Sequence, residues 1–593
     1  MSEVLGASVD LQGLLRVVGQ HLYSSPEVAL RELVQNAHDS AIRRAIEAEH
    51  APQPVIRVVA RPDERTLRFI DNGAGLTHDE IVNYLATIGG GKTRELRDVS
   101  GSEDLIGQFG LGFLSAYAIA DRVVVHTTSH TAPATSHTFS SRDGQRFTLS
   151  PGERREVGTE VVLHLKSDHA ALAQSDVVHR LLTRYCCLLP IPVLAPTAVN
   201  PEPPPWRRDL ADVTPFRLKK LRLDFAQAYE GRFRPIACIP VEPAPACPIR
   251  GVLWIQDGAS YASSDNRNIS LFVRGMLISD DLRDLVPRWA GFIGGVLECD
   301  HLHPTASRED IQRDDAFAAT VAHLREVLIQ GLRTLADHDP EAWAMFRLRH
   351  NEALLGGSLA DPRLFEVLKD SLTVPTNREP MTLPEIRKQS NGKLIQSTGS
   401  MAGVSVWFRS LDAPLIAGHR FGVAPFVARW AQQENVDVVR LGDGSEQQLI
   451  ETIDLDAAEQ ATLQTLFARP ETAIVAARFE PTTLPAILLE DTDARLKQTL
   501  EDDEASRRIA HGILSLARDV TRGIEARPIH RLYLNMDNPL VARAARERDG
   551  HLAAWALGFA ELTSSIEGDL ASALTTQQDA LLHLLAREPQ EHP

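Results

Sequence analysis

The feature that most constrains this chain is a series of four polar or glycine-rich segments near its start. In order, they are E-L-V-Q-N-A-H-D-S (Glu32–Ser40), D-N-G-A-G (Asp71–Gly75), G-Q-F-G-L-G-F (Gly107–Phe113) and G-T-E (Gly158–Glu160). Each segment alone has an ordinary structural explanation. Four of them in a fixed order favour a fold that gathers them around one ligand.

The first segment lies on a helix predicted from about Pro26 to Glu47, with Ser24 as its N-cap. At about 100° per residue, apolar and polar side chains fall on different faces. The apolar face carries Leu30, Leu33, Val34, Ala37, Ala41 and Ala45, and the polar face carries Glu32, Asn36, Asp39 and Ser40. Taken alone, the polar face is more simply explained as a solvated surface.

The two glycine-rich segments take their meaning from the elements beside them. D-N-G-A-G directly follows the β-rich run 66–70, so Asp71 stands at a strand end before a tight turn. The same letters also favour an ordinary hairpin turn. G-Q-F-G-L-G-F precedes an apolar helix, where backbone N–H groups and the helix dipole attract phosphate. Further β-rich runs at 54–60, 122–128 and 159–165 predict an α/β sandwich.

This order of segments resembles the ATP site shared by gyrase, histidine kinases, mismatch-repair ATPases and the heat-shock-protein-90 (Hsp90) chaperones, the GHKL superfamily. Three longer strings resemble the Hsp90 ATPase domain in particular: Tyr23–Ser40, Ile106–Val125 and Gly158–Lys166. The resemblance implies an N-terminal Bergerat-type α/β sandwich that binds and hydrolyses ATP.

The resemblance also implies roles for single residues. Glu32 is expected to be the general base for the attacking water, a task that suits a carboxylate. Asn36 is expected to coordinate a Mg²⁺ that bridges phosphate oxygens. Asp71 is expected to bind the adenine amino group, with Thr159 supporting it through water. The remaining predicted nucleotide-binding residues are Asp39, Ser40, Gly75, Gly107, Gly110, Gly112 and Phe113.

The segment before the second glycine loop departs from the family. Thr93–Ile106 is expected to form a lid over ATP, but it is a few residues short and its hinge reads G-G-G-K-T. Tyr84 occupies the position of a family asparagine. Thr87–Thr93 is not a P-loop, because Ala86 stands where that motif requires glycine and a helix is expected before it.

Leu271–Asp281 and Leu285–Gln312 resemble the Hsp90 middle domain. There Arg308 is expected to contact the γ-phosphate and stabilise developing charge. Taken alone, an arginine among acidic residues is more often part of a surface ion pair. Thr305 replaces an asparagine of the family's loop. If Glu32 and Arg308 come from different domains, hydrolysis requires domain docking and is coupled to conformational change.

The expected architecture is a multidomain α+β chain. It comprises an ATP-binding domain (1–198), an α/β middle domain (207–490) and a small, mainly helical dimerisation domain (505–593). A proline-rich joint (191–206) and a charged connector (489–508) separate them. Near the end, one helical face carries Leu552, Trp555, Ala556, Phe559 and Leu562. Periodicity alone does not distinguish a dimer seam from an internal core.

Composition limits the partners. Sixty-two basic against 79 acidic residues give a net charge of −17, which disfavours nucleic acid as a partner. Five cysteines without a C-x-x-C pair favour reduced thiols. Neither a signal peptide nor an apolar stretch long enough to span a membrane is found, so a cytoplasmic protein is expected.

The predicted function is that of a bacterial-type, ATP- and Mg²⁺-dependent chaperone that acts on client proteins as a homodimer. Two alternatives remain open: a nucleotide-binding scaffold with little hydrolysis, and a GHKL ATPase of DNA-repair or topoisomerase type. A sensor kinase would need a phosphoacceptor histidine on a helix before the ATP domain, and the few dozen preceding residues leave no room for it.

Overall fold

The computed structural model divides the chain into two compact units. Unit 1 comprises residues 1–259 and 265–349, unit 2 comprises residues 260–264 and 350–593, and the division falls within helix α9 (Pro340–Ala360). The structure describes residues 25–85, 112–144, 146–153, 156–209, 213–245, 247–261, 264–305, 307–398, 402–491, 494–495, 497–499 and 528–564. Ser24, the predicted N-cap, lies outside these ranges.

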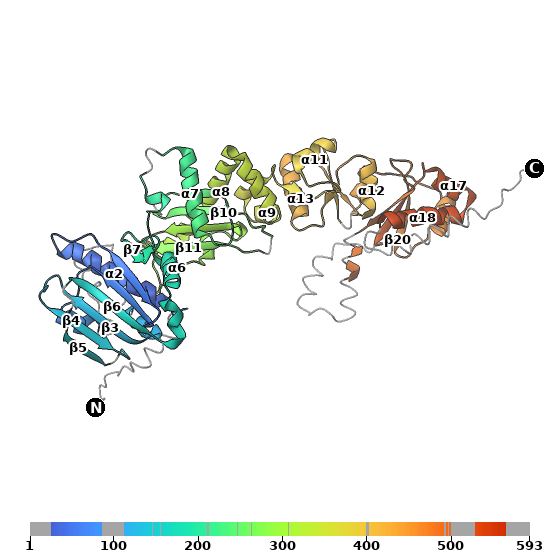
Figure 1. Ribbon diagram of the computed structural model, residues 1–593. Coiled ribbons are helices and arrows are strands. Elements are labelled where there is room, and N and C mark those ends of the chain that lie inside the picture. The colour runs from blue at the N-terminus through green and yellow to red at the C-terminus, as the bar shows by residue number, and fades with distance from the viewer. Residues whose placement is uncertain are drawn as a thin grey trace, which may run out of the picture. The chain divides into compact units, whose positions relative to one another are not determined.

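An eight-stranded sheet forms the N-terminal part of unit 1 (Figure 1). The four β-rich runs expected from the sequence form β1, β2, β3 and β6, which lie side by side in the order β3-β6-β2-β1. Their pairing is antiparallel, whereas β1 and β7 are parallel. Across the sheet the strands are β5 (Phe147–Pro151), β4 (Ser136–Ser141), β3 (Ala120–Thr128), β6 (Gly158–Leu165), β2 (Thr66–Asp71), β1 (Ile56–Arg61), β7 (Val193–Ala195) and β8 (Thr197–Ala198).

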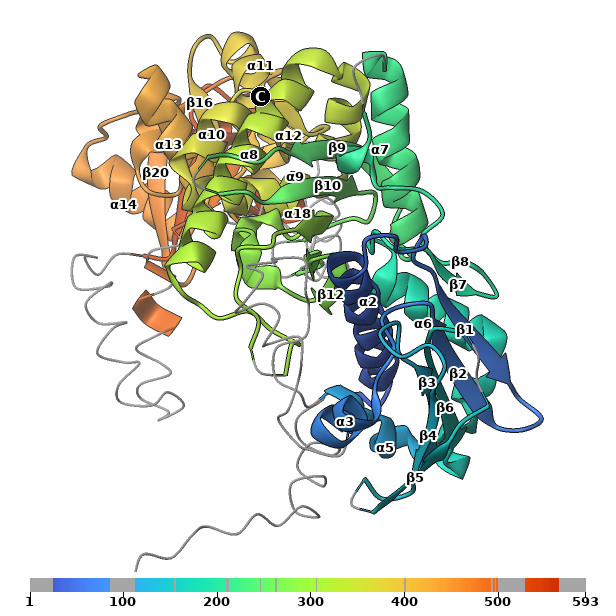
Figure 2. The ribbon, with the colours of Figure 1, turned by 90° about the vertical axis from the view of Figure 1, so that its left-hand side faces the viewer.

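Helices pack against this sheet and bury its apolar side chains. The predicted first helix is α2 (Val28–Glu47), which contacts β2 and β1 and is seen beside the sheet in Figure 2. It also packs against α5 (Ala116–Ile119) and α6 (Ser175–Cys186). The segment after the D-N-G-A-G turn is helical, as expected, with α3 (His78–Glu80) followed by a π-helical turn at Ile81–Leu85.

The second part of unit 1 is a five-stranded sheet with helices packed on it. Its strand order is β12 (Met276–Ser279), β11 (Asn268–Val273), β13 (Ile293–Glu298), β10 (Arg250–Gln256) and β9 (Pro235–Val241). Edge strand β9 alternates buried and half-buried residues, whereas every residue of central strand β13 is buried. The helices are α7 (Pro215–Tyr229), α8 (Asp315–His338) and the start of α9.

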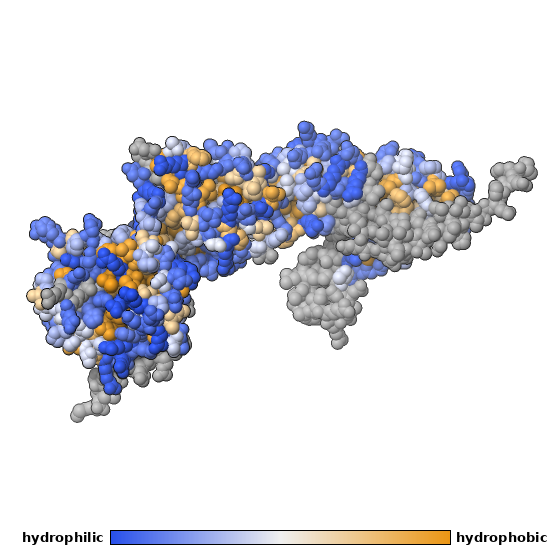
Figure 3. All heavy atoms as spheres, viewed as in Figure 1, coloured by the Kyte–Doolittle hydropathy of each residue, from blue (hydrophilic) through white to orange (hydrophobic). Residues whose placement is uncertain are grey.

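One hydrophobic cluster runs through both parts of unit 1. It joins Leu30 and Leu33 of α2 to Leu188 and Leu189 after α6, and continues to Phe272 of β11. Burial of a large apolar side chain stabilises by about 1.5–3 kcal/mol, so this shared core holds the two sheets together. Polar residues cover most of the visible surface (Figure 3). Within the described residues, no helix is both long and apolar enough to cross a membrane.

Unit 2 contains a three-stranded parallel sheet and a four-stranded mixed sheet. The first has the order β17 (Ile416–Ala417), β16 (Leu394–Ser397) and β18 (Val438–Leu441), with α12 (Ala402–Ser410) and α13 (Val423–Glu434) between its strands in sequence. The second has the order β19 (Glu451–Thr452), β20 (Thr472–Arg478), β22 (His530–Asn535) and β21 (Ala486–Glu490). Outside these sheets lie α10 (Pro362–Leu368), β14 (Thr373–Val374), β15 (Met381–Thr382), α11 (Leu383–Gln389) and α14 (Ala457–Leu466).

Residues 528–564 are expected to be mainly helical, and they contribute α17 (Pro539–Glu547) and α18 (Gly550–Ser564). They also contribute strand β22, which pairs with β20 and β21 from earlier in the chain. On the apolar face of α18, Leu552 and Ala556 are buried in a core within the chain, whereas Trp555 and Phe559 are half-buried. Leu552 and Ala556 therefore pack internally, and the side chain of Leu562 lies outside the described part of the chain.

A buried ionic network holds the four-stranded sheet to the loop after β18. The fully buried Glu446 carboxylate accepts hydrogen bonds from Tyr533 Oη at 2.7 Å and Arg531 Nη1 at 2.9 Å. It also accepts one from the backbone N–H of Gly444 at 2.8 Å. Burial tends to raise the pKa of Glu446, but these hydrogen bonds outweigh burial and hold the pKa below its usual range.

This network predicts acid sensitivity of unit 2. Because the folded-state pKa of Glu446 is depressed, its stabilisation is present above the unfolded-state pKa and is lost as pH falls through the folded-state value. Glu446→Gln should cost about 3 kcal/mol at neutral pH, as expected when one partner of a buried ion pair is removed. The substitution should also reduce the amount of stability that unit 2 loses as the pH falls. Urea titration with pulse hydrogen exchange of β20 and β22 peptides measures both; equal acid sensitivity of the two proteins would contradict the prediction.

Candidate active site

Both carboxylates on the polar face of helix α2 are buried. Glu32 is 3% exposed and Asp39 is 5% exposed, so the simpler explanation of a solvated polar face is wrong. Asn36, between them, is exposed, and its side chain has no hydrogen-bond partner among the described residues. A polar side chain open to solvent between two buried carboxylates suits the binding of a ligand that enters from outside.

The Asp71–Gly75 turn lies directly against α2. Asp71 ends β2, and its Oδ1 accepts hydrogen bonds from Gly73 N at 2.8 Å and Ser40 Oγ at 3.2 Å. A Cβ on Gly73 would lie 2.6 Å from the backbone carbon of Ser40. Glycine therefore permits the close approach that fixes the orientation of the Asp71 carboxylate.

A hydroxyl network connects this turn to the neighbouring strands. Thr127 Oγ1 accepts a hydrogen bond from Leu76 N at 2.9 Å and lies 3.1 Å from Thr159 Oγ1. Thr159 is the register partner of Asp71 across β6 and β2. Gly75 has φ +66°, and a Cβ there would lie 2.0 Å from Thr128 O, so no other residue fits this position. The structure thus brings Asp71, Gly75 and Thr159 together.

The end of the second glycine loop packs on the middle of α2. Gly112–Ser115 form a 3₁₀ turn, and a Cβ on Gly112 would lie 2.5 Å from Glu32 Oε2. Phe113 packs edge-on against Tyr117 and Phe139, with ring centroids 6.2 and 6.4 Å away. The Gly112 backbone can therefore approach the Glu32 carboxylate closely, as a phosphate-covering loop requires.

Glu32 lies between two guanidinium groups. Its Oε1 accepts a hydrogen bond from Arg31 Nη2 at 3.0 Å, and its Oε2 lies 3.7 Å from Arg308 Nη1. Arg31 Nη1 also donates to the backbone oxygen of Arg308 at 2.9 Å. All three side chains are buried, with exposures of 3% or less for Arg31 and Glu32 and 8% for Arg308. The chain therefore gathers a carboxylate and two cations from segments 276 residues apart.

A tight loop after β13 presents Arg308. The residue has φ +54°, and its N–H donates to Thr305 O at 3.0 Å. Thr305 Oγ1 lies 3.2 Å from Ser307 Oγ and also donates to Asp310 O. Thr305, which replaces the family's asparagine, thus supports the turn with its own hydroxyl group.

The structure does not reach every residue predicted for the site. Gly107, Gly110, the Thr93–Ile106 lid and the Gly89–Thr93 hinge segment lie outside the described residues. The predicted residues that the structure places on α2 and the adjoining segments are Glu32, Asn36, Asp39, Ser40, Asp71, Gly75, Gly112, Phe113, Thr159 and Arg308.

Sequence reasoning missed two residues of the site, Arg31 and Thr127. Arg31 lies beside Glu32 in sequence, and nothing in the sequence distinguishes it from an exposed charged residue of a helix. Its burial depends on contacts with the distant 307–308 loop. Thr127 sits in a run of β-branched residues, where threonine is expected for strand propensity alone. The facing Thr159 was the one available signal, since cross-strand threonines often hydrogen-bond.

Comparison with protein families supports the arrangement. Residues 23–148 match the family described as "Histidine kinase-, DNA gyrase B-, and HSP90-like ATPase". Residues 199–367 match the family "Hsp90 protein". The two matches follow each other in the chain and carry Glu32 and Arg308, respectively. In both regions the chain is similar to the Hsp90 family.

Several similar proteins of the Hsp90 family are named "Chaperone protein HtpG". The protein from Halorhodospira halophila is 27% identical over 428 residues, which cover 65% of this chain and 66% of the relative. That from Roseobacter denitrificans is 28% identical and covers 63% of each chain. That from Myxococcus xanthus is 28% identical and covers 62% of this chain and 61% of the relative. The chain thus spans just under two thirds of these relatives.

The position of Thr127 predicts a measurable stability effect. Thr127→Val removes the acceptor for the Leu76 N–H, and an unsatisfied buried donor costs about 1–3 kcal/mol. Thr127→Ser keeps the hydroxyl group and should retain most of the stability. Hydrogen exchange of β2 and β3 peptides under native conditions compares the three proteins. Equal protection in the valine and serine variants would show that the Thr127 hydroxyl group contributes nothing to the stability of these strands.

Proposed function

We propose that this chain is an ATP-dependent chaperone of the cytoplasm, acting as a homodimer that hydrolyses ATP slowly. The observation that carries the proposal is the contact between Glu32 of α2 and Arg308 of the loop after β13. A general base and an arginine that meet beside a glycine-rich loop are the parts needed for phosphoryl transfer to water. Similarity to the Hsp90 family supports the chaperone part of the proposal.

The residues would divide the work as follows. Asp71, oriented by Ser40 and Gly73, accepts a hydrogen bond from the adenine amino group, with Thr159 beside it. Gly112 and the preceding loop cover the phosphates. When a γ-phosphate enters, Arg308 shifts from Glu32 to the phosphate oxygens, because a phosphate accepts a bidentate guanidinium. Glu32 then orients the attacking water and accepts its proton.

Magnesium would bind through Asn36 and the phosphate oxygens. Mg²⁺ usually keeps several waters and takes few protein ligands beside substrate phosphates, which an exposed amide side chain satisfies. When bound, the ion would neutralise charge on the β- and γ-phosphates. Among the described residues, no group of three or more His, Cys, Asp or Glu side chains could hold a metal ion.

A nucleotide-binding scaffold with little hydrolysis is the second candidate, because the lid hinge departs from the family pattern. A DNA-repair or topoisomerase ATPase is less well supported, because Hsp90-type sequence continues through residues 199–367. Stimulation of ATP turnover by DNA would favour that ATPase, and binding without turnover would favour the scaffold.

Two substitutions separate binding from hydrolysis. Glu32→Ala should lower kcat at least about 100-fold while ATP binding persists, because the base is lost but the proposed adenine contacts of Asp71 remain. Asp71→Asn should abolish both, because the single amide oxygen would be held by Gly73 N and Ser40 Oγ, which leaves an NH2 donor facing the adenine amino group. Turnover is measured by phosphate release and binding by calorimetry. The control is Glu64→Ala, an exposed acid on the β1–β2 turn; wild-type turnover in Glu32→Ala would disprove the proposed role of Glu32.

Chaperone activity and assembly need their own measurement. The purified chain should reduce aggregation of a heat-denatured model enzyme, and nucleotide should change that effect in wild type but not in Asp71→Asn. Light scattering should give about twice the chain mass of 65.3 kDa. A monomer without any effect on aggregation would contradict the chaperone proposal even if ATP is hydrolysed.

A further inference from the structure

A buried carboxylate lies at the end of the strand that leads to Arg308. Glu298 is the last residue of β13 and is 1% exposed. Its Oε2 accepts hydrogen bonds from Trp206 Nε1, Arg207 Nε and Arg250 Nε, each at 3.0 Å. Its Oε1 accepts a further one from Arg207 Nη2. We call these four residues the Glu298 cluster.

Arg207 extends this cluster to the ATP-binding part of unit 1. Its Nη1 donates to the backbone oxygen of Leu188 at 2.7 Å, while the other two nitrogens hold Glu298. Leu188 follows α6 and belongs to the same hydrophobic cluster as Leu30 and Leu33 of α2. The Arg207 guanidinium group therefore connects the backbone just after α6 to β13, the strand that precedes the Arg308 loop.

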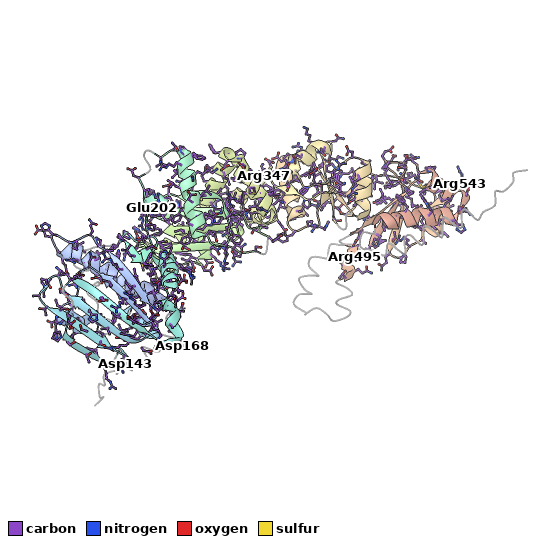
Figure 4. All side chains as sticks on the ribbon, in the orientation of Figure 1. Asp143, Asp168, Glu202, Arg347, Arg495 and Arg543 are labelled. Atoms are coloured by element: carbon purple, nitrogen blue, oxygen red, sulfur yellow. The ribbon has the colours of Figure 1, made fainter. Side chains whose placement is uncertain are left out.

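Two further contacts show that the approach between these segments is close. Gly275, in the β11–β12 turn, has φ +76°, and a Cβ there would lie 2.7 Å from Leu188 O. Arg184 of α6 forms an ion pair with Asp280 just after β12. Glu202 lies in the proline-rich segment before Trp206 and is labelled in Figure 4. It forms an ion pair with Arg208, just after Trp206.

Arg250 serves as an internal comparison. It holds the same Glu298 oxygen, at 3.0 Å, but its side chain is 39% exposed and it does not bond to Leu188. Burial tends to raise the pKa of Glu298, but Arg207, Trp206 and Arg250 together hold the pKa below its usual range. The carboxylate is thus charged at neutral pH, and of its two arginines only Arg207 makes the link to Leu188.

We propose that Arg207 is a positioning residue for ATP hydrolysis, which sets the placement of Arg308 against Glu32 by tying Glu298 to Leu188. This inference rests on the proposed ATPase function. Arg308 follows Glu298 by ten residues, and Leu188 shares a hydrophobic cluster with Leu30 and Leu33, which flank Glu32 on α2. The Arg207 bridge therefore connects the segment that carries Arg308 to the core under the helix that carries Glu32. A displacement of about 1 Å at a reacting centre can cost 100-fold in rate.

The test compares Arg207→Ala with Arg250→Ala. Arg207→Ala should lower kcat roughly tenfold or more and leave the KM for ATP within about twofold, because the adenine contacts are untouched. Arg250→Ala should keep kcat within about twofold of wild type. The split between kcat and KM separates positioning from a general loss of structure, and a melting curve of each protein checks the fold.

Arg207→Lys covers the case in which the alanine variant fails to fold. Lysine keeps a positive charge beside Glu298, but one ammonium group does not reproduce the planar fork that reaches both carboxylate oxygens and Leu188 O. This variant should melt near the wild-type temperature and should hydrolyse ATP more slowly than the wild type. Wild-type kcat in a folded Arg207 variant would overturn the positioning role alone. A wild-type protein without Glu32-dependent turnover would overturn the proposed function as well.

Discussion

The buried contact of Glu32 with Arg31 and Arg308 is the interaction on which the rest of the site depends. Removing a carboxylate and two guanidinium groups from water is costly, so these groups are stable there only while each keeps its partner. The contact joins α2, which packs on the first sheet, to the loop after β13 of the second sheet, so it depends on the geometry of both parts. A γ-phosphate would compete for the same cations, which gives the proposed nucleotide a direct means of changing the contact.

Close backbone approach is the second constraint. Gly73, Gly75 and Gly112 each lie where a Cβ would meet Ser40, Thr128 or Glu32, respectively. These glycines bring the turn after β2, the end of β3 and the glycine-loop terminus against one helix. The hydroxyl group of Thr127 then satisfies backbone groups of Leu76 and Gly158 and contacts the hydroxyl group of Thr159. Close packing and hydrogen bonds therefore fix the described polar groups of the site relative to one another.

The two units hold their sheets in place by different contacts. Unit 1 joins its two sheets through a shared apolar cluster and adds the Glu298 cluster at the seam. Unit 2 joins its four-stranded sheet to the β18 loop through Glu446 and Arg531, and it closes its core with α17 and α18. In both units a buried carboxylate is fixed by arginine and an aromatic donor, Trp206 in one and Tyr533 in the other. Such groups fix a geometry more than they add stability.

The sequence by itself determined the secondary structure around the site, the helix Pro26–Glu47 and the strands before Asp71 and at Thr159, because these follow from local periodicity and turn residues. The resemblance to the Hsp90 family predicts Glu32, Asp71 and Arg308 as site residues, and the structure brings Glu32 and Arg308 into contact. Only the tertiary structure decided that Glu32 and Asp39 on the polar face of α2 are buried, that Arg31 shares Glu32 with Arg308, and that β22 pairs with β20 from earlier in the chain. The physical reason is that burial and ion pairing depend on segments far apart in the chain, whose meeting no local pattern encodes.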